Sequence, residues 1–215
     1  MIKEITSKII GQLRQEDQFP DWWKSSKIEV PFFENEKLTV IFMDFEPEHD
    51  KTFIEEADQA LKNFLKLNLV DRNSISDLAY RNCKDFLDAV DFDEADQPLR
   101  QIKNYNEIWN FIHPTEIYVT RRPYKEHDVY LTLACECDWE QEHGLQLVFR
   151  QGKQLTRISD QDGHLTEADA YGKPDEEDEL LSNYNIGTMR KPTHNSISPK
   201  VKRTWWQKLF VPNKH

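Results

Sequence analysis

Glycine and cysteine are scarce in this sequence, and long apolar runs are absent. The six glycines form no GxGxxG array, so the sequence has no Gly-rich phosphate loop. Three cysteines, an odd number, argue against a secreted disulfide scaffold and favour a reducing cytoplasm. No stretch approaches the roughly 18 apolar residues of a membrane-spanning helix, and MIKEITSKIIGQLRQ lacks the features of a signal peptide. We therefore expect a cytoplasmic protein with no transmembrane segment.

Negative charge predominates, with 39 acidic and 28 basic residues and a net charge of −11. Residues 190–215 contain seven basic residues and no acidic ones, which leaves residues 1–189 with 21 basic and 39 acidic groups, a net −18. A body this acidic repels phosphate backbones, so nucleic acid is not expected as a partner. A basic protein partner fits this charge better.

Residues 129–158 have the clearest pattern. Apolar side chains occupy every second position over 129–139, which predicts a strand with one buried face. The polar stretch 139–144 predicts a turn, after which Leu145, Leu147 and Phe149 resume the alternation. A second turn at 151–153 leads to another strand, and residues 115–122 read as the strand that enters this antiparallel meander.

The N-terminal half predicts helices and one hairpin. Ile2, Ile5, Ile9 and Leu13 recur at spacings of three and four, which predicts an amphipathic helix over 2–14. Residues 27–33 and 38–45 predict a β-hairpin, and apolar periodicity predicts helices over 51–68 and 75–90, the second with an N-cap at Ser74. The expected fold is α+β: an antiparallel sheet, made of the meander and the hairpin, packed against two to three helices.

Composition divides the chain into three parts. Residues 1–172 are expected to form a single α+β domain, and residues 173–204 a flexible linker, acidic and then basic. Residues 205–215 form a short aromatic C-terminal segment with Trp205 and Trp206. This segment has three alternative roles: docking on the body, binding a partner, or peripheral contact with a membrane surface.

Two constellations near the expected 139–144 turn could carry chemistry. His143 beside Glu140 and Glu142 could act as a general base, or the turn could simply be polar. Cys135 and Cys137 with His143 suggest zinc, but structural zinc needs a second ligand pair. We therefore expect buried core thiols, no metal and no other cofactor.

The register of the expected hairpin follows from the position of its turn. With the turn centred on Glu142, Cys137 would lie opposite Leu147 and Cys135 opposite Phe149. Both thiols would then face the apolar side of the sheet.

The segment CECDWEQEHGLQLVFRQGK, at Cys135–Lys153, resembles a bacterial domain family of unknown function. Members of that family carry a Cys-x-Cys-x-Trp-x-x-Glu-His-Gly-Leu pattern followed by a strand and a glycine turn. The resemblance is strongest over 115–172. Some relatives look like small soluble proteins from toxin–immunity loci, which implies a binding role by analogy.

Together these observations favour a cytoplasmic interaction protein, of immunity type, that binds a basic partner through an acidic surface. The alternatives are a hydrolase that uses Glu142 and His143, and a Cys/His metal-binding protein. The sequence leaves the oligomeric state open. The expected binding residues are Trp139, Glu140, Glu142, His143, Trp205 and Trp206.

Overall fold

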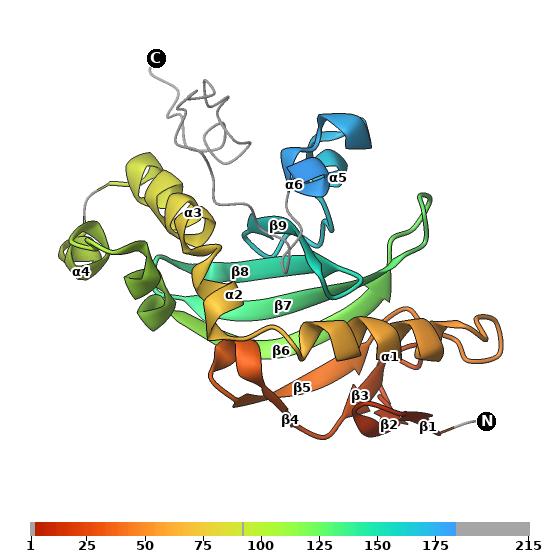
Figure 1. Ribbon diagram of the computed structural model, residues 1–215. Coiled ribbons are helices and arrows are strands. Elements are labelled where there is room, and N and C mark those ends of the chain that lie inside the picture. The colour runs from red at the N-terminus through yellow and green to blue at the C-terminus, as the bar shows by residue number, and fades with distance from the viewer. Residues whose placement is uncertain (1–2, 92, 184–215) are drawn as a thin grey trace, which may run out of the picture.

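One mixed sheet runs through the part of the chain that the structure, a computed structural model, describes, which is residues 3–91 and 93–183 (Figure 1). Its strand order is β1-β2-β3-β5-β6-β7-β8-β9, with β4 paired to β5 beside this path. The strands are β1 (Glu4–Ser7), β2 (Gly11–Gln15), β3 (Trp23–Ser25), β4 (Ile28–Val30), β5 (Glu36–Phe42), β6 (Ile112–Arg121), β7 (Val129–Cys137), β8 (Glu140–Arg150) and β9 (Gln154–Ser159).

The helices follow mainly between β5 and β6. The α-helices are α1 (Phe53–Phe64), α2 (Leu69–Asn73), α3 (Ser76–Ala89), α4 (Gln97–Arg100), α5 (Glu167–Tyr171) and α6 (Glu179–Asn183). The 3₁₀ helices are η1 (Pro31–Phe33), η2 (Glu94–Asp96), η3 (Tyr105–Phe111) and η4 (Asp175–Glu177). Strands β5 and β6 pair in parallel, and the long connection through α1–α4 supplies the crossover that such a pair requires. The other paired strands are antiparallel.

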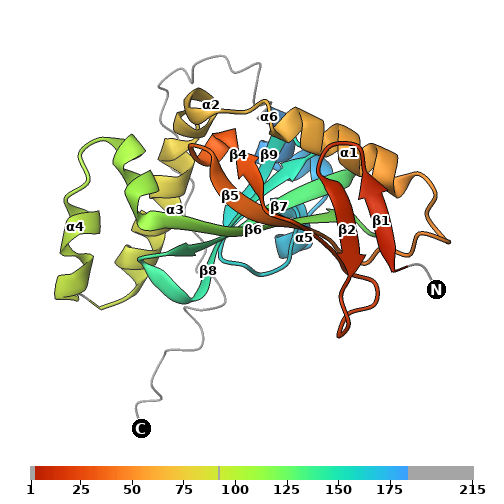
Figure 2. The same ribbon diagram turned by 90° about the horizontal axis from the view of Figure 1, so that it is seen from below.

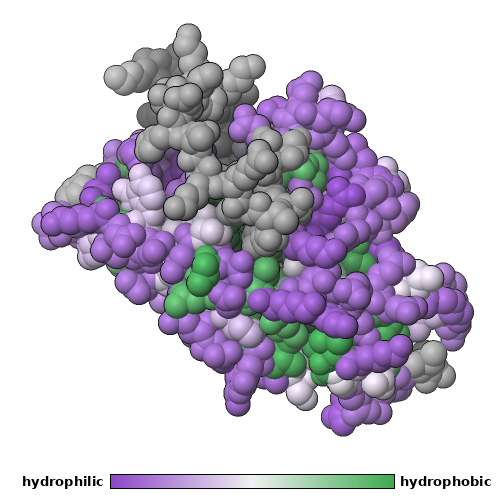
Figure 3. All heavy atoms as spheres, viewed as in Figure 1, coloured by the Kyte–Doolittle hydropathy of each residue, from purple (hydrophilic) through white to green (hydrophobic). Residues whose placement is uncertain are grey.

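Helices lie on both faces of the sheet, with α1 and α5 on opposite sides (Figure 2). The α1 side holds the main core, in which Phe32, Phe64 and Phe149 meet with ring centroids 5.3–5.7 Å apart. On the other face, Leu165 just before α5 packs with Tyr130 and Val148 in a smaller cluster. The outer surface seen in Figure 3 is mainly hydrophilic, and hydrophobic residues form only small patches on it.

Helix α1 is held at its start and near its middle by polar contacts. At its start, Asp50 accepts hydrogen bonds from the backbone N–H groups of Thr52 and Phe53. Further along, the buried carboxylate of Asp58 accepts from the Ser7 hydroxyl and from the Lys8 backbone N–H. These bonds fix α1 relative to the β1–β2 turn and to the loop that precedes the helix.

The α+β class is confirmed, but the sheet is larger than the predicted hairpin and meander. The predicted helix over 2–14 is wrong, because residues 4–15 form β1 and β2 joined by a short turn, and Gly11 begins β2 with φ +80°. Ile5 and Leu13 lie directly opposite each other in this hairpin and are both buried. Apolar residues eight positions apart share one face of a helix, and they also meet across a short hairpin, so spacing alone could not separate the two.

The hairpin of β4 and β5 and the helices α1 and α3 confirm the other predictions for the N-terminal half. The predicted N-cap is wrong. Ile75 occupies the cap of α3, and the Ser74 hydroxyl donates to the backbone oxygen of Asp71 at the end of α2.

The predicted turn over 139–144 is displaced. Strand β7 ends at Cys137 and β8 begins at Glu140, so the turn is shorter and lies earlier in the chain. Cys137 is opposite Glu140 and Cys135 is opposite Leu145, with a register irregularity between them, so the predicted pairings with Leu147 and Phe149 are wrong. The polar residues that predicted the turn instead begin β8.

Residues 173–183, which we expected to begin the linker, contain η4 and α6 and contact the sheet. Gln154 on β9 donates through its side chain to the backbone oxygen of Leu180 at 3.2 Å. The buried carboxylate of Asp178 accepts from the backbone N–H of Ala168 at 2.8 Å. The rest of the expected linker and the segment with Trp205 and Trp206 lie outside the described residues.

Candidate functional site

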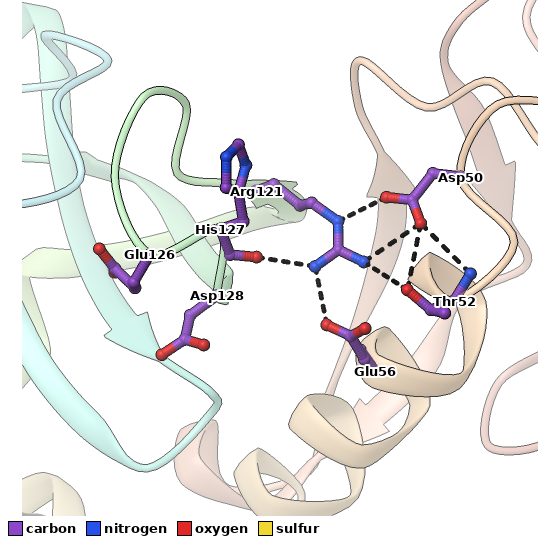
Figure 4. A pocket seen from close by; sticks show the side chains of 7 residues that line it. All are labelled: Asp50, Thr52, Glu56, Arg121, Glu126, His127 and Asp128. Atoms are coloured by element: carbon purple, nitrogen blue, oxygen red, sulfur yellow. Dashed lines mark hydrogen bonds and ion pairs between the residues drawn. The ribbon is translucent and has the colours of Figure 1, made fainter.

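A cleft of about 390 Å³ lies between the start of α1 and the loop that joins β6 to β7 (Figure 4). Its lining is highly charged, with four carboxylates against one guanidinium. Before His127 is counted, the formal charge of the lining is therefore −3. The lining residues are Asp50, Thr52, Glu56, Arg121, Glu126, His127 and Asp128.

Arg121 reaches from the end of β6 to the α1 wall of the cleft. Its guanidinium contacts both oxygens of Asp50, at 2.5 and 3.3 Å, and donates to Glu56 Oε2 at 2.7 Å. It also donates to the Thr52 hydroxyl at 3.1 Å and to the backbone oxygen of His127 at 2.7 Å. These hydrogen bonds from Arg121 hold the pKa values of Asp50 and Glu56 below their ordinary range, so both carboxylates stay charged.

The opposite wall is fixed by a second set of ion pairs. Asp128 Oδ2 accepts from Arg150 Nε at 2.7 Å. Glu126 accepts from Arg122 at 3.1 Å through Oε2 and from the Tyr130 hydroxyl at 2.6 Å through Oε1. Burial and the hydrogen bond to Glu126 raise the pKa of Tyr130, so its hydroxyl remains a donor. Both walls are thus held in place by the protein's own ion pairs and hydrogen bonds, as a preformed binding site requires.

A smaller cavity of about 110 Å³ continues along α1 from the same cleft. Glu56 and Asp128 line both cavities, one from each wall, so they stand at the junction. At the far end, Asn63 donates to the backbone oxygen of Gln151 at 3.0 Å, which links α1 to the β8–β9 turn. The other lining residues are Gln59, Ala60, Asn63, Val129 and Gln151.

Of the residues singled out in the sequence, those that the structure describes gather at the β7–β8 hairpin, and none of them lines either cavity. Glu140 accepts the backbone N–H groups of Glu142 and His143 at 2.9 and 2.8 Å, and its Oε2 lies 3.4 Å from His143 Nδ1. Each of the three residues offers one ligand atom, and these atoms lie within 4.8 Å of one another. The geometry of these three residues is therefore compatible with a metal ion. The two exposed members, Glu142 and His143, line neither cavity.

Trp139 and the cysteines lie in the core. Trp139 is 4% exposed, and its indole N–H donates to Asn82 of α3 at 3.1 Å. Cys135 and Cys137 are buried, as predicted, and Cys83 of α3 is buried too. Burial raises the pKa values of Cys83 and Cys137 to about 12 and that of Cys135 well above the ordinary value, so none offers a thiolate near neutral pH.

The sequence alone did not predict the cleft, because the residues that line it lie far apart in the chain. Asp50 and Arg121 are separated by 71 positions. Two local signals existed: the dense charge of Arg121–Asp128, and Asp50 placed just before a predicted helix. Neither signal indicates that the two segments meet.

A mixed sheet with helices on both faces and a preformed acidic cleft at one end of β6 define an α+β protein with a candidate binding site. The model of a domain of unknown function, DUF6985, matches residues 9–165, more than half of the chain, and the protein belongs to this family. The matched region includes the whole cleft. No curated protein and no solved structure matches the chain. In the part of the chain that the structure describes, no helix has the length and apolar character needed to cross a membrane.

Proposed function

We propose that this protein is an interaction module that captures a cationic segment of a protein partner in the Arg121 cleft. The observation that carries the proposal is the formal charge of −3 in one open cleft whose walls are held by their own ion pairs. Negative charge in a concave site concentrates field lines and raises the local concentration of cations. The rest of the acidic body adds to this field and speeds encounter with a basic partner.

This function agrees with a cytoplasmic protein of immunity type that neutralises a basic toxin. Such proteins need fast capture and a rigid complementary surface rather than chemistry. The repulsion of phosphate by the same charges argues against nucleic acid as the ligand.

The hydrolase alternative has less support. A general base acts on a substrate held within hydrogen-bond reach, and such sites are concave. Glu142 and His143 are exposed on the hairpin and line neither cavity. The thiol-based metal alternative is weak for a different reason. Among the described residues, the only His, Cys, Asp and Glu side chains with three ligand atoms within 4.8 Å of one another are Glu140, Glu142 and His143, and none of these is a thiol.

A peptide titration tests the proposal. We expect a labelled peptide rich in lysine and arginine to bind the full chain, and a glutamate-rich peptide of equal length not to bind. Because exposed charges are screened within a few Å at about 1 M salt, affinity should fall steeply with added NaCl. The double variant Glu56→Gln/Asp128→Asn should bind much more weakly.

The matched control is Glu55→Gln/Glu176→Gln, which removes the same charge from two exposed positions outside the cleft. Retained binding in this control assigns the effect to the cleft. An equal loss in both double variants, or binding that salt leaves unchanged, would show that the cleft is not the site.

A further inference from the structure

We infer that the cleft selects a primary ammonium group, the lysine side chain of an extended peptide, over the guanidinium of arginine. Glu56 and Asp128 hold this ammonium between the two walls. The inference rests on the proposed function and narrows its ligand. The preference for lysine follows from the carboxylate oxygens of the cleft, because some of them are already bonded to arginine or tyrosine side chains of the protein and others are not.

Two of the four carboxylates have both oxygens engaged. Both carboxylate oxygens of Asp50 contact Arg121, so a guanidinium is already paired with this carboxylate in the two-bond arrangement. Glu126 uses one oxygen for Arg122 and the other for Tyr130. Neither side chain presents a pair of oxygens to an incoming ligand.

The other two carboxylates are each ion-paired through one oxygen, and Glu56 also bonds to the Thr52 side chain. Arg121 pairs with Oε2 of Glu56, and Arg150 pairs with Oδ2 of Asp128. The second oxygen of each, Glu56 Oε1 and Asp128 Oδ1, lies outside these ion pairs. The acceptors left for a cation are therefore single oxygens that belong to opposite walls.

This arrangement fits an ammonium better than a guanidinium. Arginine binds carboxylates most strongly through two parallel hydrogen bonds to the two oxygens of one carboxylate. An ammonium is a compact charge with three donors that point in different directions, so it can donate to oxygens of two separate carboxylates.

The smaller cavity accounts for the rest of the ligand. It begins at the same two carboxylates and passes over the apolar side chains of Ala60 and Val129. Its volume of about 110 Å³ suits the narrow methylene stem of a lysine, which packs along apolar surface while its charged end stays in a polar site. The side-chain amides of Gln59 and Gln151, which also line this cavity, can bond to the backbone of an extended peptide.

A divalent metal ion fits the cleft carboxylates less well than an ammonium group does. A protein-held cation needs several ligand atoms that converge on one point. Across residues 3–91 and 93–183, three such atoms from His, Cys, Asp or Glu side chains come within 4.8 Å of one another only at Glu140, Glu142 and His143, outside the cleft. The guanidinium of Arg121 in the cleft further opposes a metal ion.

The test compares two labelled peptides that are identical except for lysine or arginine at three positions. Fluorescence anisotropy with the full chain should show about tenfold tighter binding of the lysine peptide, the gain expected for one charge-assisted hydrogen bond. In Glu56→Gln and in Asp128→Asn, the preference should fall below about twofold. In Glu55→Gln, an exposed control on the same helix, the preference should be unchanged.

A third peptide makes the test independent of protein folding. Trimethylation of the lysines keeps their charge but removes their N–H donors, so its binding to the wild-type chain should be about tenfold weaker. Equal affinity for the lysine, arginine and trimethyl-lysine peptides would overturn the inference and leave cationic capture standing. Absence of binding to all three would overturn the proposed function as well.

Discussion

Arg121 and Arg122 are adjacent in the chain, but their side chains lie on opposite faces of the sheet. Arg121 binds the start of α1, whereas Arg122 donates to Asp169 of α5 and Asp175 of η4, with contacts of 2.8–2.9 Å. Successive side chains of a strand alternate between faces, so one dipeptide can anchor two different layers. The end of β6 therefore fixes both the cleft and the C-terminal segment that covers the far face.

Replacing Arg122 should release that C-terminal segment. Only 1% of its side chain is exposed, and Arg122→Met leaves Asp169 and Asp175 without their main partner. We expect a loss of about 3 kcal/mol in the free energy of unfolding, because breaking a buried pair strands its charges. Urea denaturation measures this loss in stability.

The matched control is Arg14→Met, which removes a well-exposed arginine and should cost no more than about 0.5 kcal/mol. Similar losses for both variants would contradict the anchoring role of Arg122.

The ion pairs of Arg121 predict how stability depends on pH. Arg121 lowers the pKa values of Asp50 and Glu56 from their ordinary values of 3.8 and 4.5. A carboxylate whose pKa is lower in the folded state contributes stability above its ordinary pKa and loses it as the pH falls through the lowered value. Urea midpoints should therefore drop as the pH falls below about 4.5. In Arg121→Met this drop should be smaller; an identical pH profile would show that the pairs add no stability.

The sequence predicted structure well where one local pattern sufficed. The alternation of β7 and the apolar faces of α1 and α3 are each contained in a single segment, and each was found. The hairpin of β1 and β2 was missed because its contact between Ile5 and Leu13 matches helical spacing as well. The parallel pairing of β5 with β6 was also missed, since it joins segments on either side of four helices.

The candidate site was harder to predict than the fold. The prominence of Glu142 and His143 in the sequence reflects a local cluster, whereas the cleft depends on the distant pair of Asp50 and Arg121. Residues that meet only through tertiary packing leave no periodic trace in the sequence. The polar residues around Glu140 have a structural role, because they form the start of β8.

Glu140, rather than Glu142, should stabilise the β7–β8 hairpin. Its carboxylate accepts the backbone N–H groups of both Glu142 and His143. Glu140→Ala should therefore cost about 1–2 kcal/mol, the worth of hydrogen bonds to a charged acceptor. Glu142→Ala should change stability by less than about 0.5 kcal/mol, as is usual for exposed positions. Thermal melts of the two variants compare them directly, and a larger effect of Glu142→Ala would reverse the assignment.

The three thiols should be inert in the folded protein. Burial raises the pKa values of Cys83 and Cys137 to about 12, and the nucleophile in thiol chemistry is the thiolate. A disulfide reagent at pH 8 should label no cysteine in the native chain and all three in urea. We also expect no bound zinc, and about 1 kcal/mol of destabilisation for Cys137→Ala. Rapid labelling of the native chain, or stoichiometric zinc lost in Cys137→Ser, would contradict burial of unligated thiols.

Gly152 should be the least replaceable glycine of the cleft region, because the β8–β9 turn presses directly on α1. A Cβ atom there would lie 2.0 Å from the backbone oxygen of Ala60, and the residue has φ +64°. Gly152→Ala must therefore separate the turn from α1, at a cost above about 2 kcal/mol in denaturation experiments. Gly163→Ala is the matched control: its φ of +78° carries the same kind of backbone strain, but a Cβ would meet nothing within 4 Å. It should cost only about 1 kcal/mol.

The two variants should also differ in peptide binding. Because Ala60 lines the smaller cavity, the separation caused by Gly152→Ala should weaken lysine-peptide binding, and Gly163→Ala should leave this binding intact. Equal destabilisation by the two variants would mean that backbone strain, and not contact with α1, makes glycine necessary at position 152.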